Sequence, residues 1–360
     1  MKKNHSEDLR AKKTGFDTYA KMHHEFRPFV MSTNADNFKS KIVNTDKFGF
    51  RKTYYKKKLI GLDQIKKISK NQNIITGAST AFGMGSPSDK DTIHSHLSKK
   101  IPCVSLAARG APSQQEVVIY LQFKRYFSKV KNIIILSGRN DIGLCARKNS
   151  LFYPEFGGVI GEEERLLNLI SQYNFFGLDK WKTGINNLFS LISIAARKSQ
   201  SIRFILGLFS NIYTTNTEKR IKKRLSLSFN KKMTFLKKII QNDFDTWSMI
   251  AKKNNINIIY IFQPVLSWSK RSLSSYEKKI NDNERKRFRK IFTIDICRKD
   301  IYISHKKFIK QMCQKYSIKF YDANDWSKQS DPSKNFFIDD CHLTAYGNLF
   351  LASKIKKILK

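Results

Sequence analysis

The fold can be worked out from one stretch of the chain, Asn73-Ile74-Ile75-Thr76-Gly77-Ala78-Ser79-Thr80-Ala81-Phe82-Gly83. Its first part, residues 73–76, predicts a short buried strand, and Gly77 ends that strand. Ser79 then stands where a strand turns into a helix. Such a turn exposes the hydroxyl at the C-terminal edge of a sheet and points the amides of the helix start toward it. Ser79 is therefore a candidate nucleophile, and an ordinary N-cap serine is the alternative.

Further strands alternate with helices along the rest of the chain. We expect core strands at residues 101–106, 132–136, 256–262 and 318–321. Apolar residues recur at helical spacing over residues 229–251, which predicts one long amphipathic helix that Asn254-Asn255 ends. This alternation predicts an α/β fold, with a parallel sheet covered on both faces. In such sheets ligands bind beyond the carboxyl ends of the strands.

Several smaller elements also have sequence signals. Residues 42–51 suggest an edge strand followed by a turn, and residues 59–70 a short helix. Ser113 and Glu116 have the spacing of a capping box at the start of a helix. The basic stretch up to about residue 295 reads as a loop, followed by a helix through Lys315 and by a terminal helix after Gly347.

The chain has 360 residues, of which 41% are hydrophobic, enough for one large domain or two modest ones. We expect a basic lead-in at residues 1–70 and a catalytic domain at residues 71–360, with a helical insertion at about 145–225. Two apolar segments in that insertion, residues 185–196 and 202–213, are too short and interrupted to span a membrane. A helical insertion packed on the core and a hairpin on a membrane surface are the alternatives, and either is compatible with a lid.

The net charge of +39 predicts an anionic partner: an acidic glycan, an acidic membrane face or nucleic acid. No helix-turn-helix, zinc-finger or RNA-recognition signature accompanies it, so we do not expect specific nucleic-acid binding.

The five cysteines are scattered, which predicts neither a disulfide framework nor a zinc site. The charged N-terminus lacks the apolar segment of a signal peptide, so we expect a cytoplasmic protein, with peripheral contact at the inner membrane surface as an option.

Among the histidines, His342 has an acid at a spacing that suits both side chains as a unit. Asp339 lies three residues earlier and could orient the imidazole, which a serine nucleophile needs as its base. Asp340 is a rival partner, although we expect it to cap the following helix. Gly110 and Asn140 each follow a predicted strand and could donate to an oxyanion, with a turn glycine and a loop cap as the alternatives.

Four blocks of the sequence resemble the SGNH (GDSL-type) hydrolase superfamily: Gly77-Ala78-Ser79, the stretch around Gly110, Gly138-Arg139-Asn140-Asp141 and Asp339-Asp340-Cys341-His342. The resemblance covers residues 71–360, with residues 145–255 outside the motifs. It implies a three-layer α/β/α, flavodoxin-like fold with a central, mostly parallel five-stranded sheet. By the same resemblance, Ser79, Asp339 and His342 are the catalytic triad, and Ser79, Gly110 and Asn140 form the oxyanion hole.

The sequence departs from the family where Ala78 replaces the usual aspartate before the nucleophile. Residues 43–51 loosely resemble a segment of bacterial members that are associated with surface polysaccharides. The leading hypothesis is an esterase that removes O-acyl or O-acetyl groups from carbohydrate through an acyl-enzyme on Ser79. An O-acetyltransferase that modifies a capsular or other surface polysaccharide is the alternative, and an inactive protein that binds an anionic partner is the second.

No metal-ligand or coenzyme-binding motif stands out, so we expect no cofactor. Acetyl-coenzyme A would serve as acyl donor only in one version of the transferase. Arg139, beside Asn140, could contact an acid group of an anionic substrate, and a surface arginine is the alternative reading.

Overall fold

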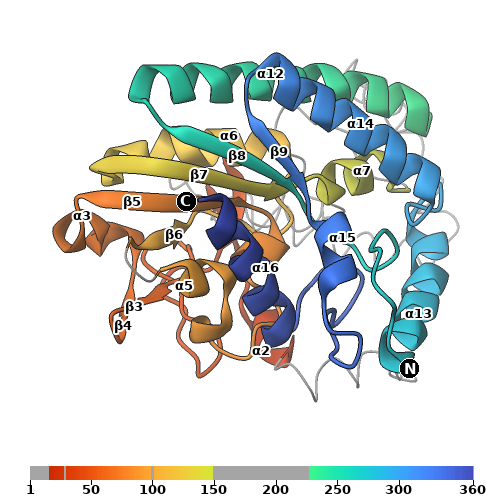
Figure 1. The fold of residues 1–360 in the computed structure, drawn as a ribbon, viewed down its shortest axis with the longest axis horizontal. Helices are drawn as coiled ribbons and strands as arrows, with labels where there is room; N and C mark the ends of the chain where they lie inside the picture. Colours follow the sequence, from red (N-terminus) through yellow and green to blue (C-terminus); the bar gives the residue numbers. More distant parts are fainter. Residues whose placement is uncertain (1–15, 28–29, 99–100, 149–226, 360) are drawn as a thin grey trace, which may run out of the picture.

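The computed structural model describes residues 16–27, 30–98, 101–148 and 227–359. Its centre is a five-stranded sheet made of β5 (Asn71–Gly77), β6 (Cys103–Ser105), β7 (Lys129–Ser137), β8 (Asn257–Phe262) and β9 (Lys319–Asp322). The spatial order is β6-β5-β7-β8-β9, and every neighbouring pair is parallel (Figure 1). This is the 2-1-3-4-5 order of flavodoxin-like sheets. The predicted α/β fold with a central five-stranded sheet is confirmed.

Successive residues of the strands serve opposite faces of the sheet, as the period of two requires. Ile133 and Ile135 of β7 belong to one apolar core, and Ile134 and Leu136 belong to the other. The first face is covered by α6 (Ser113–Phe123), α12 (Phe229–Asn254) and α14 (Lys299–Lys315), and the second by α4 (Ser79–Phe82), α5 (Ile93–Leu97) and α16 (Ala345–Ile358). Because both faces are buried, the three central strands, β5, β7 and β8, contain continuous isoleucine-rich runs rather than alternating ones.

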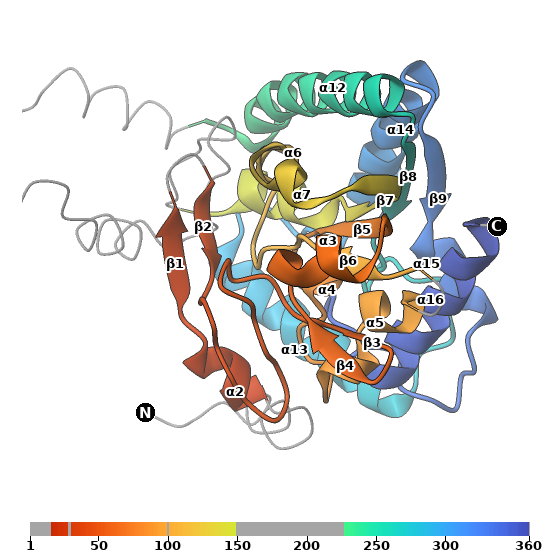
Figure 2. The same ribbon diagram turned by 90° about the vertical axis from the view of Figure 1, so that its left-hand side faces the viewer.

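The described part of the predicted lead-in forms regular structure. It comprises α2 (Phe16–Lys21), β1 (His24–Arg27), β2 (Met31–Asn34), β3 (Thr53–Tyr55), β4 (Lys58–Ile60) and α3 (Ile65–Ile68). β1 pairs with β2 and β3 with β4, each antiparallel, and Figure 2 shows the first pair beside the main sheet. The remaining helices of the described residues are α7 (Arg139–Ala146), α13 (Ser275–Ile291) and α15 (Ala323–Trp326). Short 3₁₀ turns lie at Leu62–Gln64, Asp89–Asp91, Lys124–Tyr126 and Ser327–Gln329.

Residues 275–291 correct the prediction of a loop between β8 and the helix that ends at Lys315. They form α13, which begins with a capping box between Ser274 and Glu277. The sequence signal was weak because α13 buries few apolar side chains along its length; Phe288 is one of them. The spacing of Ser274 and Glu277, three residues apart, is the sequence signal that could have predicted the start of this helix.

The predicted capping box at Ser113 and Glu116 is wrong. Pro112 is the N-cap of α6, and the Ser113 amide donates to Asp141 Oδ1 over 3.0 Å. Glu116 instead accepts a hydrogen bond of 2.6 Å from the Ser137 hydroxyl. Glu116 thus bonds to Ser137, the last residue of β7, and not to the start of its own helix as the spacing suggested.

Two predictions in the lead-in need correction as well. Residues 59–70 divide into the end of β4, a 3₁₀ turn and α3, because Gly61 interrupts the expected helix. Residues 42–51 form a loop closed by one antiparallel bridge between Thr45 and Arg51 rather than an edge strand.

The predicted insertion at residues 145–225 lies outside the described residues, apart from its first few positions. This includes the two apolar segments at residues 185–196 and 202–213. Within the described ranges, no helix has the length and apolar character needed to cross a membrane.

Replacing Gly77 by alanine tests the turn that follows β5. Gly77 has φ of 145°, and a Cβ there would lie 2.2 Å from the Leu136 carbonyl oxygen. We expect G77A to lower the free energy of unfolding by about 3 kcal/mol or more, because neighbouring backbone cannot move aside cheaply. Urea unfolding measures the loss.

The matched control is G110A. Gly110 also has positive φ, 81°, but nothing lies within 4 Å of an added Cβ. We expect G110A to lower the free energy of unfolding by only about 1–2 kcal/mol, which is the cost of placing alanine in a left-handed backbone conformation. Equal losses in the two variants would contradict this account of Gly77.

Candidate active site

A continuous hydrogen-bonded chain joins Ser79, His342 and Asp339. Ser79 Oγ lies 2.7 Å from His342 Nε2, and His342 Nδ1 lies 2.6 Å from Asp339 Oδ2. Ser79 is the first residue of α4, directly beyond β5, while the other two lie in the loop before α16. The structure therefore brings together the three residues that the sequence analysis selected as a triad.

The contacts of His342 define which ring nitrogen carries the proton. Because an ionised carboxylate only accepts hydrogen bonds, Nδ1 donates to Asp339, and Nε2 is left to accept from the Ser79 hydroxyl. Burial alone would lower the pKa of His342, but the Asp339 carboxylate and the neighbouring Cys341 together outweigh burial and hold this pKa well above its usual value. The imidazole thus becomes a neutral base only on the alkaline side of its ordinary titration range.

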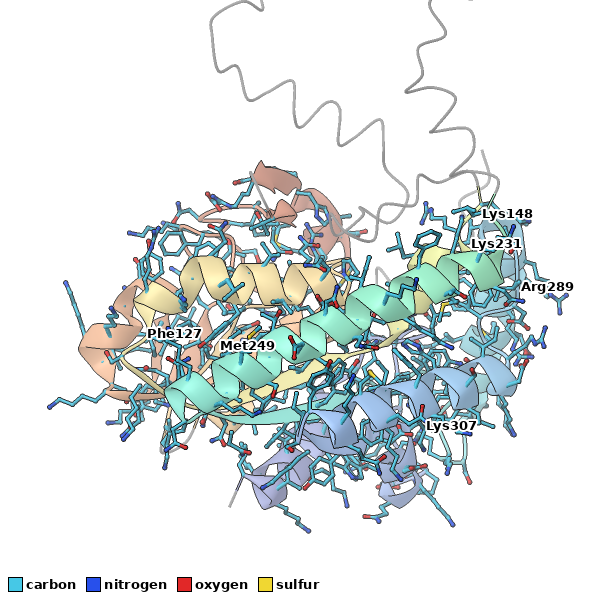
Figure 3. All side chains as sticks on the ribbon, turned by 90° about the horizontal axis from the view of Figure 1, so that it is seen from above. Phe127, Lys148, Lys231, Met249, Arg289 and Lys307 are labelled. Carbon is cyan, nitrogen blue, oxygen red and sulfur yellow. The ribbon has the colours of Figure 1, made fainter. Side chains whose placement is uncertain are left out.

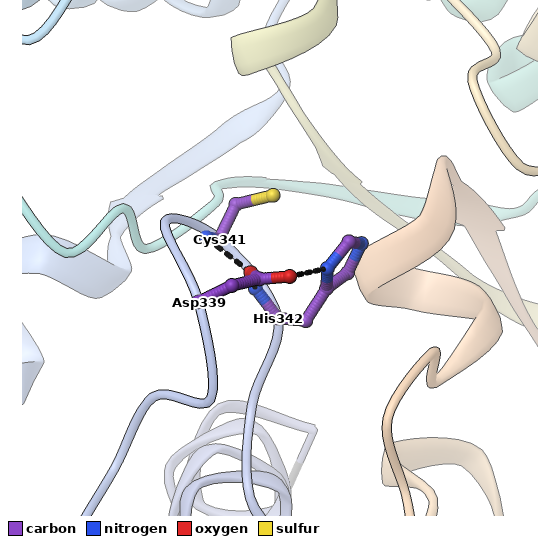
Figure 4. Close-up of side chains that lie close together, drawn as sticks. All are labelled: Asp339, Cys341 and His342. Carbon is purple, nitrogen blue, oxygen red and sulfur yellow. Dashed lines mark hydrogen bonds and ion pairs between the residues drawn. The ribbon is translucent and has the colours of Figure 1, made fainter. Parts of the chain in front are cut away.

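Asp339 is itself fixed by its own loop. Its second oxygen, Oδ1, accepts from the backbone amides of Cys341 and His342 over 3.0 and 2.8 Å. Figure 4 shows the resulting tight turn with the carboxylate facing the imidazole. All three carboxylate contacts lie within four consecutive residues, so the Asp-x-x-His spacing in the sequence already specifies this part of the site.

The same turn contains three side chains of types that ligate metals. Ligand atoms of Asp339, Cys341 and His342 lie within 4.8 Å of one another. A metal ion bound by all three would have to replace the proton that His342 Nδ1 shares with Asp339 in a hydrogen bond of 2.6 Å. The donor set therefore fits a charge-paired histidine better than a metal centre.

Gly110 and Asn140 lie at the same edge of the sheet as Ser79. They follow β6 and β7, the two strands that flank β5. The Asn140 side chain is buried and donates through Nδ2 to the Ala111 carbonyl over 3.1 Å, which ties it to the Gly110 turn. The space beside Gly110 is open, so a ligand can approach its backbone closely. The structure thus places Gly110 and Asn140 at the strand ends on either side of β5, and their role as oxyanion donors stays a prediction.

Asp141 strengthens the link between these two turns. Its Oδ1 accepts from the Ser113 amide at the start of α6, and burial raises its pKa to about 6. The beginnings of α6 and α7 are thereby connected through a carboxyl group in the protein interior.

Thr80 and Gln263 connect two segments of the site: the nucleophile turn, residues 77–80, and the histidine loop, residues 338–342. The sequence analysis missed both residues. The Thr80 hydroxyl donates to the Cys341 carbonyl over 3.1 Å and accepts from Gln263 Nε2 over 3.2 Å. Ala78, which stands where the related family has aspartate, is buried and offers no side-chain hydrogen bond. Thr80, which follows Ser79 in the sequence, makes the side-chain hydrogen bonds that Ala78, which precedes Ser79, does not make.

The lead-in supports the far end of α4. Arg51 is fully buried, pairs with Asp89 at 2.7 Å and donates to the Gly83 carbonyl at 2.6 Å. The Tyr19 hydroxyl also donates to Gly83, over 3.2 Å. Since Gly83 is the C-cap of the helix that Ser79 begins, residues far upstream fix the position of the nucleophile turn.

Arg139 has a different contact from the one proposed for it in the sequence analysis. Its guanidinium pairs with Asp340 and lies 5.5 Å from the centre of the Phe288 ring, and its side chain is only 12% exposed. The prediction that Asp340 caps the following helix is wrong, because Thr344 caps α16. The ion pair instead connects the residue before Asn140 with the residue after Asp339.

No protein-family model matches the chain, and no match was found among curated proteins. Two solved structures are similar over 80% of the chain: an acetyl xylan esterase, with 11% identity and a TM-score of 0.37, and an extracellular lipase from Streptomyces rimosus, with 12% identity and a TM-score of 0.39. The match covers 100% of the first protein and 99% of the second. At this identity and TM-score, neither activity is transferred to this chain.

A double-mutant cycle tests the ion pair between Arg139 and Asp340. We expect D340N to cost about 3–5 kcal/mol of stability, because it leaves the buried Arg139 charge without its partner. R139M should cost less, because Arg287 still lies 4.0 Å from Asp340. The double variant should lose clearly less than the sum of the two single losses, as measured by urea unfolding. Additive losses would contradict the assignment of these residues as a pair.

Proposed function

We propose that this protein is a serine-dependent ester hydrolase that works through an acyl-enzyme on Ser79. The observation that carries the proposal is the contact of 2.7 Å between Ser79 Oγ and His342 Nε2, continued by His342 Nδ1 to Asp339. A serine hydroxyl is a weak nucleophile by itself, and a base at this distance is what activates it.

The reaction would proceed in two halves. Ser79 Oγ attacks the ester carbonyl carbon while its proton passes to His342 Nε2, and Asp339 stabilises the imidazolium that forms. Gly110 and Asn140, with the Ser79 amide, would donate to the developing oxyanion. His342 then gives its proton to the departing alcohol, which leaves the acyl group on Ser79. Water, deprotonated by His342, releases the acid and restores the serine.

For the substrate, we favour an O-acyl or O-acetyl group on a carbohydrate. The support is the loose resemblance of residues 43–51 to a segment of SGNH-type proteins that are associated with surface polysaccharides; the four sequence blocks support ester chemistry in general. The net charge of +39 suits an acidic glycan or a related anionic substrate. Transfer of the acyl group to a sugar hydroxyl is the alternative outcome, since both reactions share the same covalent intermediate.

A non-catalytic binding protein would also account for Ala78 and for the basic charge. The connected triad counts against it, because binding an anion requires no hydrogen-bonded chain from Ser79 to a buried carboxylate. Hydrolysis is therefore the better-supported function.

Hydrolysis of p-nitrophenyl acetate tests the proposal. We expect S79A to lower kcat by about 10³-fold or more, since nucleophile and base act as a unit. The rate should rise with pH through an apparent pKa above 6.5, because His342 must be neutral to accept the proton and Asp339 raises its pKa. In D339N the rising part of the pH–rate profile should move to lower pH, and the maximal rate at high pH should be smaller.

The matched control is S113A, which also changes a serine that begins a helix after a strand. It should retain most of the activity. Activity that is equal in wild type and S79A would contradict the proposal. Adding a monosaccharide separates the two reaction types, because a transferase yields the sugar ester, seen by mass spectrometry, at the expense of free acetate.

A further inference from the structure

An open cavity of about 680 Å³ lies outside the triad, between α14 and the loop that follows β8. Six of its lining residues are cationic: Lys270, Arg271, Lys299, Lys306, Lys307 and Lys310. We call this cavity the basic cleft. Its volume is in the range that encloses a small organic ligand.

The loop side of the basic cleft is rigid. Trp268 is buried, stacks on Tyr302 with ring centres 5.5 Å apart, and donates through its indole nitrogen to the Ile296 carbonyl over 3.2 Å. Arg271 is held by an ion pair with Glu277 and by a hydrogen bond of 2.9 Å to Ser330. These contacts preform the wall, so a ligand would not have to order it.

Two of the cleft's lysines are already neutralised by acids. Lys306 lies 2.6 Å from Asp322 and 3.0 Å from Asp325, and Lys270 lies 2.5 Å from Asp325. With Arg271 paired to Glu277, three of the six cations are accounted for by neighbouring carboxylates.

Lys299, Lys307 and Lys310 carry the remaining charge. All three belong to α14, and Figure 3 marks Lys307 on this helix beside α12. Within the described residues, none of the three has an ion pair. Lys307 and Lys310 are one helical turn apart, where like charges repel. An anion in the cleft would remove that repulsion.

The types of side chain indicate which anion fits. Arg271, the one arginine in the lining, uses its guanidinium in hydrogen bonds to Ser330 and to the carbonyls of Asp331 and Lys334. It therefore has no free pair of N–H groups for bidentate binding of a ligand carboxylate. Lysine ammonium groups are point charges with three donors each, and a tetrahedral phosphate accepts hydrogen bonds from several directions. Ile303 lies among the lysines and adds an apolar contact.

We propose that the basic cleft binds a small soluble compound that carries two or more phosphate groups. Lys299, Lys307 and Lys310 provide the charge, and Trp268 and Tyr302 provide the rigid wall. None of these residues belongs to the triad, so the proposal stands independently of the chemistry at Ser79.

Calorimetric titration of the full chain with inorganic tripolyphosphate, at about 0.15 M ionic strength, tests the proposal. We expect saturable binding with one site per chain. The triple variant K299Q/K307Q/K310Q should bind at least about tenfold more weakly. Thermal unfolding in the absence of ligand establishes that the variant is folded.

The matched control is K278Q/K279Q/K286Q, which removes the same charge from exposed positions of α13 outside the cleft. Its affinity should stay within about twofold of the wild type. Equal weakening in both triple variants would overturn the proposal in favour of general charge attraction. Three other results would overturn it: no binding by the wild type, equally tight binding of citrate, or binding only to vesicles of an anionic phospholipid.

Discussion

The hydrogen bond between Ser79 and His342 is the interaction on which the rest of the structure depends. It joins residues 263 positions apart in the sequence, and at 2.7 Å it tolerates little displacement of either side. The first core strand and the last loop of the chain must therefore end at the same place. The parallel sheet achieves this, because β5 lies inside it and all its strands point their carboxyl ends to one edge.

The histidine loop needs further support, since it follows no core strand directly. Its ends are joined by a hydrogen bond of 3.0 Å from the Ile338 amide to the His342 carbonyl. The Leu266 amide, from the loop after β8, donates to the Asp340 carbonyl over 2.7 Å. Arg139 adds its ion pair from the start of α7. Contacts from two neighbouring strand ends thus position the base relative to the nucleophile.

Three buried charges close to the candidate site are paired with an opposite charge. Arg51 has Asp89, Arg139 has Asp340, and His342 has Asp339. Removing one member of such a pair leaves a charge in a poorly solvated place, which costs more than the pair contributes. The large positive charge of the chain therefore does not reach the triad directly. It is carried by surfaces such as the basic cleft, where three lysines of α14 form no ion pair within the described residues.

Local signals made much of this molecule predictable from its sequence. The central strands β5, β7 and β8 are isoleucine-rich runs closed by glycine, proline or polar residues. Asp339 and His342 lie close enough in sequence to indicate their pairing. The prediction of a parallel sheet followed from the alternation of strands and helices, whereas the order of the strands was not predicted. Gly110 and Asn140 were selected by position alone, as residues that follow strands, and their role as oxyanion donors stays a prediction.

Long-range contacts account for what the sequence analysis missed. Nothing near Thr80 in the sequence indicates Gln263 or the Cys341 carbonyl, and nothing near Arg51 indicates Gly83. Arg139 looked like a substrate ligand because its partner lies 201 residues away. α13 was missed for another reason, since its surface is mostly charged and its apolar repeat is weak.

The central claim is that the His342–Asp339 pair activates Ser79, and the most direct test is the mass of the intact protein after reaction with a fluorophosphonate probe. The account predicts one adduct per chain, mapped by peptide sequencing to Ser79, and much slower labelling once His342 is replaced by glutamine. A folded wild-type protein that takes up no probe, or that carries it on another serine, would contradict the account.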